Sequence, residues 1–113
     1  MRILGFSKKW EKLSQPEFTT FRFIRKDRDW EIGEVVQVVY KPRQKGGGEL
    51  MGVAEIIALK ARANMQYISE SEVRADGFES YDAMDLWMEK MYGYRRWNFE
   101  PMNKLTLRWV KRK

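Results

Sequence analysis

The chain of 113 residues contains neither cysteine nor histidine. These two absences exclude disulfides, thiol nucleophiles, imidazole general bases and the usual ligands of zinc. A catalytic site could use only carboxylates, hydroxyls, lysines and the backbone. Few enzyme mechanisms work with these groups alone. Asp27 and Asp29 have a spacing that could hold a metal ion, but the neighbouring cations more plausibly neutralise them. We therefore expect no metal and no cofactor.

Long hydrophobic runs are also missing. No stretch approaches the roughly 18 apolar residues of a membrane span, and the apolar run near Met1 is shorter than the core of a signal peptide. The triple glycine Gly46–Gly48 lacks the lysine and hydroxyl of a phosphate-binding loop and opens no helix, so it indicates only flexibility. The length fits a single domain over residues 1–113. We expect a cytoplasmic protein that makes no membrane contact.

The charge is distributed unevenly. The chain carries a formal net charge of +6, yet residues 69–89 alone have a net charge of −6 and the remainder +12. Such asymmetry in a small domain favours a basic surface that faces a polyanion. The alternative is a set of merely solvated charges. The acidic segment could instead dock a partner protein.

Hydrophobic alternation predicts five strands, and two helices follow the fourth. The β-branched run Val35–Tyr40 is the strongest strand signal and pairs back across a glycine-rich tip with the next strand, where Gly52 could form a bulge. The expected strands are Arg2–Phe6, Glu17–Arg22, Val35–Tyr40, Met51–Leu59 and Lys104–Trp109. This order predicts an α+β fold, a small mixed β-barrel with helices packed at one side.

The two helices have clear start and stop signals. Ser69 opens the first with the S-x-x-E spacing of a capping box, and Gly77 stands where a left-handed terminal residue is expected. Ser80 opens the second, which Gly93 ends. Its apolar stripe of methionine and aromatic side chains is typical of core packing. Asp82, Asp85 and Glu89 are expected to face water.

The run Glu17–Arg22 places a hydroxyl beside a guanidinium group. Because side chains alternate between the faces of a strand, Phe18, Thr20 and Arg22 share one side, while Phe21 lies on the other. Binding, catalysis and core packing each remain open for this pair.

Basic residues interleaved with aromatic residues suit single-stranded or looped nucleic acid, because bases stack on rings while cations follow the phosphates. The acidic helices argue against reading of the major groove by a helix. For Trp30, stacking and burial in the core are equally open. The candidate binding residues are Arg22, Arg25, Lys26, Arg28, Trp30, Lys41, Arg43, Lys45, Arg95 and Arg96.

Several short motifs, in their order and spacing, carry a resemblance to a known family. They are Phe18–Arg22, Ile32–Val36, Gly52–Ile56, and Ala75–Phe78 with Ser80 opening a helix. Together they make nearly the whole chain similar to the ASCH domain, named for activating signal cointegrator homology. The approach to the last strand, Pro101-Met102-Asn103, resembles small stand-alone archaeal members.

The resemblance implies a PUA-like β-barrel with a cleft between barrel and helices, and binding of RNA or other nucleic acid. Some relatives are hydrolases that deacetylate N4-acetylcytidine with a threonine, a lysine three positions before it and an acidic residue near the helical junction. Thr20 and Asp76 match the first and last of these, but Glu17 occupies the lysine's place. A hydroxyl without a nearby base is a poor nucleophile, so binding of nucleic acid ranks above hydrolysis of a modified nucleoside or of RNA.

Overall fold

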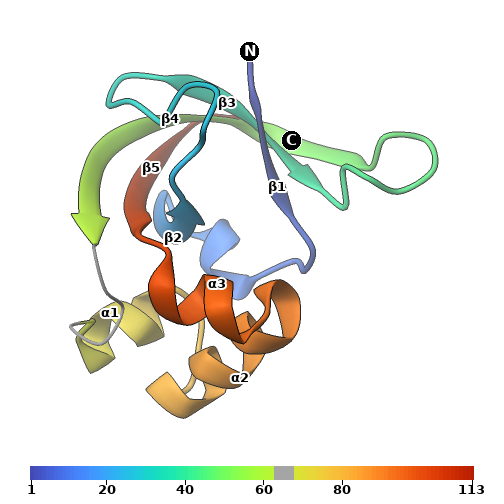
Figure 1. Ribbon diagram of the computed structural model, residues 1–113. Helices are drawn as coiled ribbons and strands as arrows, with labels where there is room; N and C mark the ends of the chain where they lie inside the picture. Colours follow the sequence, from blue (N-terminus) through green and yellow to red (C-terminus); the bar gives the residue numbers. More distant parts are fainter. Residues whose placement is uncertain (63–67) are drawn as a thin grey trace.

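A curled, five-stranded mixed sheet with helices at one end forms the fold, in a computed structural model that describes residues 1–62 and 68–113 (Figure 1). This agrees with the α+β, barrel-like fold expected from the sequence. The strands are β1 (Ile3–Phe6), β2 (Glu17–Phe23), β3 (Val35–Tyr40), β4 (Glu49–Arg62) and β5 (Met102–Arg112); the helices are the 3-10 helix η1 (Glu11–Ser14), α1 (Glu70–Ala75), α2 (Tyr81–Tyr92) and α3 (Tyr94–Phe99).

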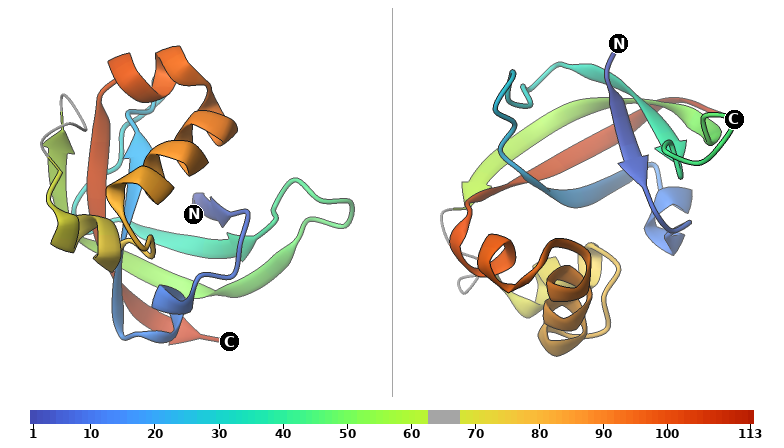
Figure 2. Two further views of the ribbon diagram at one scale, coloured as in Figure 1. Left: turned by 90° about the horizontal axis from the view of Figure 1, so that it is seen from below. Right: turned by 45° about the vertical axis from the view of Figure 1, so that its right-hand side comes forward.

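The strand order in the sheet is β1-β3-β4-β5-β2, so β1 and β2 are its two edges. Only β1 and β3 run parallel; the other neighbours are antiparallel. The long strands β4 and β5 bend, with register shifts at three places along β4, one of them beside Gly52. Both views in Figure 2 show the resulting curl, which brings the edges toward each other. Across the gap, the rings of Phe6 and Phe18 meet edge to face with their centroids 6.2 Å apart.

Two apolar cores lie on the two sides of the sheet. Inside the curl, Leu4, Val36 and Ile56 pack with Leu105 and Leu107, all of them almost fully buried. The second core fills the space between the sheet and the helices, and β2 contributes to it through Phe21 and Phe23. Strand β2 therefore buries a side chain from each of its faces, which matches the alternation expected for it.

The helix caps form as expected. Ser69 and Glu72 make a complete capping box, and Gly77 follows α1 with φ +112°. The hydroxyl of Ser80 accepts a hydrogen bond from the backbone N–H of Ala83, and Gly93 ends α2. None of the helices in the described ranges is long and apolar enough to cross a membrane.

Two expectations about the helical layer were wrong. A third helix, α3, follows α2 directly, because it docks through the buried side chain of Trp97. Asp85 does not simply face water: its Oδ1 accepts a 2.6 Å hydrogen bond from Nε1 of Trp97. This bond satisfies the one polar group of a ring that is only 2% exposed.

Candidate functional site

A cleft of about 950 Å³ opens between the edge strands β1 and β2, the helix η1, the helix α2 and the start of the β3–β4 hairpin. Its volume lies in the range of small-molecule and cofactor sites. Thr20 and Asp76, which the resemblance singles out, and the candidate binding residue Arg22 all line this cleft. Aromatic rings and cations share its walls. The rings belong to Phe6, Trp10, Phe21, Trp30, Phe78, Trp87 and Tyr92, and the cations to Lys12, Arg22, Arg25, Lys41 and Arg43.

A buried ion pair joins η1 to the junction between α1 and α2. Nζ of Lys12 lies 3.1 Å from Oδ1 of Asp76, and the two side chains are only 8% and 5% exposed. The junction is held tightly, because Gly77 lies under the ring of Trp10, so close that a Cβ atom there would come within 2.7 Å of the ring. Trp10 also meets Phe78 edge to face. The wall of the cleft at this point is therefore rigidly packed.

Burial dominates the electrostatics of this pair. It raises the pKa of Asp76 to about 6, although Lys12 and the more distant Arg22 and Lys104 favour the carboxylate. Burial likewise lowers the pKa of Lys12, and Asp76 opposes that shift. The pKa of the Arg22 guanidinium is also lowered by burial. The inner end of the cleft thus holds charges with little surrounding water, where they interact strongly with any ligand.

Thr20 and Arg22 lie side by side on β2, as the alternation of the strand predicts. Nε of Arg22 donates a 3.1 Å hydrogen bond to the Thr20 hydroxyl oxygen. The guanidinium group stacks on the ring of Phe6, 4.6 Å from its centroid. Arg22 therefore has a fixed orientation at the floor of the cleft.

Glu17, which the resemblance aligns with the lysine of the hydrolytic relatives, does not line the cleft. It points from the opposite face of β2 to Thr20, is exposed, and pairs with Arg108 at 3.4 Å. The charged partner of Asp76 is Lys12. Since 64 positions separate Lys12 from Asp76, no local spacing could have revealed the pair.

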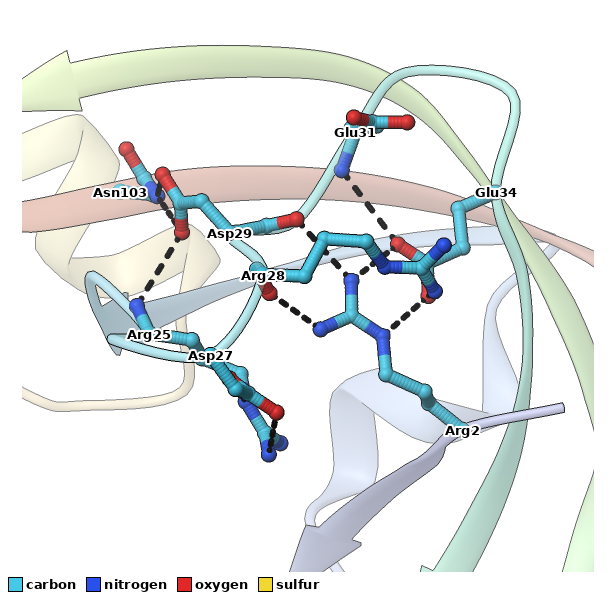
Figure 3. Close-up of polar contacts among 8 residues, drawn as sticks. All are labelled: Arg2, Arg25, Asp27, Arg28, Asp29, Glu31, Glu34 and Asn103. Carbon is cyan, nitrogen blue, oxygen red and sulfur yellow. Dashed lines mark hydrogen bonds and ion pairs between the residues drawn. The ribbon is translucent and has the colours of Figure 1, made fainter.

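The loop between β2 and β3, residues 24–34, is held by the hydrogen bonds in Figure 3. Arg2 reaches into it from the N-terminus and donates to both carboxylate oxygens of Glu34 and to the backbone carbonyls of Arg28 and Asp29. From the other side, Nδ2 of Asn103 lies 2.9 Å from each carboxylate oxygen of Asp29. The loop is therefore an ordered part of the fold.

The cations of this loop mostly have carboxylate partners. Arg25 pairs with Asp27 at 2.9 Å and Arg28 with Glu34 at 3.6 Å (Figure 3). Hydrogen bonding from Arg25 lowers the pKa of Asp27, so the carboxylate stays ionised. A phosphate would have to compete with these partners for Arg25 and Arg28. Among the basic residues of this loop, Lys26 is exposed and has no ion pair with another described residue.

Three of the candidate binding residues do not form an open surface on which bases could stack. They are Trp30, Arg95 and Arg96. Trp30 is only 6% exposed, and the guanidinium groups of Arg2 and Arg25 lie 4.5 and 5.4 Å from its ring centroid. Its ring supports the loop and is not free to stack on a base. Arg96 stacks on Phe23 at 4.2 Å, and neither Arg95 nor Arg96 lines the cleft.

The hairpin between β3 and β4 contributes the other cations. Lys41 and Arg43 line the outer end of the cleft and are exposed, while Lys45 lies farther along the loop. None of the three has an ion pair with another described residue. Figures 1 and 2 show this hairpin projecting from the body of the protein.

No family model, curated protein or solved structure matches this chain significantly. Within residues 1–62 and 68–113, no group of acidic side chains is arranged to hold a metal ion. The assignment of a function therefore depends on the chemistry of the cleft and on the resemblance of the sequence motifs.

Proposed function

We propose that this protein is a PUA-like module of the ASCH type that binds single-stranded nucleic acid, RNA in particular, in the cleft between sheet and helices. The observation that carries the proposal is the composition of the cleft, whose walls combine aromatic rings with five cationic side chains. Rings of this kind accept nucleobases and cations accept phosphates. The curled sheet with a cleft beside its helical layer also agrees with the architecture that the family resemblance implies.

The test is binding of a fluorescein-labelled oligoribonucleotide, followed by anisotropy at several salt concentrations. For single strands, the logarithm of the affinity is expected to fall with the logarithm of the salt concentration by about 0.7 for each phosphate neutralised. An oligodeoxyribonucleotide of the same sequence separates RNA binding from DNA binding. If neither strand binds with a Kd below about 10 μM at low salt, the proposal is wrong, since even non-specific binders reach roughly 10⁻⁴ to 10⁻⁶ M.

A second candidate function is hydrolysis of a modified nucleoside such as N4-acetylcytidine, or of RNA, in the same cleft. Lys12 favours hydrolysis. The hydrolytic relatives have a lysine where this chain has Glu17, and Lys12 supplies an amine beside Asp76 instead. Burial lowers the pKa of Lys12, which makes its neutral, basic form more accessible. Incubation with N4-acetylcytidine tests this function, with the isosteric Thr20→Val as the control. Turnover that survives Thr20→Val would exclude the proposed site.

A further inference from the structure

We infer that the cleft takes one unstacked base of a single strand, and that the phosphates beside this base lie on the β3–β4 hairpin against Lys41 and Arg43. The loop of residues 24–34 is not the phosphate site. This inference rests on the proposed function and assigns separate roles to the two ends of the cleft.

The wall of the cleft that Trp10 and helix α2 form suits a flat, largely apolar group. Trp10 and Trp87, whose rings lie 5.3 Å apart at their centroids, are only half-buried, and so is Tyr92. Met88 and Met91 from α2 complete this part of the wall. The whole cleft, at about 950 Å³, has room for a nucleoside but not for a duplex. A base can enter only after it leaves its stack, which costs least in a single strand.

The edges of the sheet supply hydrogen-bonding groups to the same space. Along β1, the carbonyls of Arg2, just before the strand, and of Phe6 accept hydrogen bonds from the backbone N–H groups of Gln37 in β3 and of Lys41, which follows β3. Because the direction of backbone groups alternates along a strand, the N–H and C=O of Gly5 point away from β3, toward the cleft that Gly5 lines. On β2, Pro16 accepts from Trp109, so by the same alternation the backbone groups of Phe21 point away from β5. Donors and acceptors on two strand edges suit the polar edge of a base.

The two basic elements that flank the cleft differ in whether their cations are paired with carboxylates. In the loop of residues 24–34, Arg25 and Arg28 each have a carboxylate within 3.6 Å, and Lys26, which has no ion pair with another described residue, does not line the cleft. On the hairpin, Lys41 and Arg43 have no such partner in the part of the chain that the structure describes. A phosphate gains more from an unpaired cation, because it displaces only water and counterions. The hairpin is therefore the better phosphate site.

Four variants that each remove one positive charge test the placement of the phosphates. They are Lys41→Asn, Arg43→Gln, Arg25→Gln and the control Lys60→Gln, which lies near the far end of β4. Asparagine at position 41 tolerates the left-handed backbone there, with φ +49°. Binding of a fluorescein-labelled ten-residue oligouridylate is measured by anisotropy over a series of salt concentrations.

Each hairpin variant is expected to reduce the magnitude of the salt slope by about 0.7, while Arg25→Gln and Lys60→Gln leave it unchanged. A loss of slope in Arg25→Gln but not in the hairpin variants would overturn the inference. Equal slopes in all four variants would also overturn it, since diffuse attraction by the whole basic surface would then explain the salt dependence. If the wild-type protein shows no salt-dependent binding at all, it is the proposed function that fails.

An abasic ribose-phosphate strand of the same length tests the placement of the base. It keeps every phosphate and loses only the bases, whose stacking on aromatic side chains contributes roughly a 5- to 150-fold gain in affinity per base. We expect the abasic strand to bind weaker by at least 5-fold with the same salt slope. Oligouridylate should also quench the tryptophan fluorescence and the abasic strand should not. Equal affinity of both strands would show that no base enters the cleft.

Discussion

Removal of the Lys12 ammonium group should destabilise the fold strongly, and more so at high pH. The ion pair with Asp76 spans 3.1 Å between side chains that are at most 8% exposed. At an effective dielectric constant of about 20, two unit charges at this distance attract by about 5 kcal/mol. Lys12→Met keeps the aliphatic packing and leaves the Asp76 carboxylate buried without its partner. We expect a loss of about 3 to 5 kcal/mol in the free energy of unfolding at pH 8.

The pH dependence follows from the direction of the Asp76 shift. Burial already raises its pKa to about 6 in the folded protein, and loss of Lys12 raises it further. A carboxyl group whose pKa is raised by folding binds more protons in the folded state, so stability is lost as pH rises from about 4 through the folded pKa. In the wild type this loss ends near pH 6, whereas in Lys12→Met it continues above pH 6. The penalty of the substitution should therefore be small at pH 5 and large at pH 8.

Urea unfolding followed by tryptophan fluorescence at pH 5 and pH 8 measures this effect. The matched control is Lys9→Met, which breaks an exposed ion pair with Glu49 of similar length, 3.0 Å, and should cost at most about 1 kcal/mol at either pH. The double variant Lys12→Met with Asp76→Asn should recover much of the stability, because no charge then stays buried. If Lys12→Met costs no more than Lys9→Met, or costs the same at both pH values, the reasoning is refuted.

Three further substitutions test other parts of the fold by urea unfolding. Asn103→Ala removes both hydrogen bonds to the Asp29 carboxylate and should cost about 1.5 to 3 kcal/mol, with faster trypsin cleavage within residues 24–34; unchanged cleavage would contradict the tethering role. Asp85→Ala leaves the buried indole N–H of Trp97 without its acceptor and should cost about 1 to 3 kcal/mol, whereas a neutral result would show that water replaces the carboxylate. Gly52→Ala forces a Cβ atom against a carbonyl of β5 at φ +151° and should cost about 2 kcal/mol or more; a smaller loss would mean that the bulge relaxes.

Local signals in the sequence were sufficient for most of the secondary structure. The β-branched run of β3, the capping box at Ser69 and the terminal glycines Gly77 and Gly93 each act through the backbone within a few residues. Helix α3 was missed because it has six residues and no side-chain cap, so it depends on tertiary docking of Trp97. The parallel pairing of β1 with β3 was likewise beyond a local pattern, since it joins strands more than 30 positions apart.

The sequence by itself determined which side chains of β2 share a face, and it placed Thr20 and Arg22 side by side, because alternation is a property of any extended backbone. Asp76 was selected by the family resemblance, which implies an acidic residue near the helical junction. Only the tertiary structure decided which charges face one another: Lys12 with Asp76, Arg2 with Glu34, and no carboxylate for Lys41 among the described residues. Coulombic attraction depends on distance in space and on burial, and neither can be read from separation along the chain. For this reason the phosphate site that we propose lies on the hairpin and not on the loop of residues 24–34.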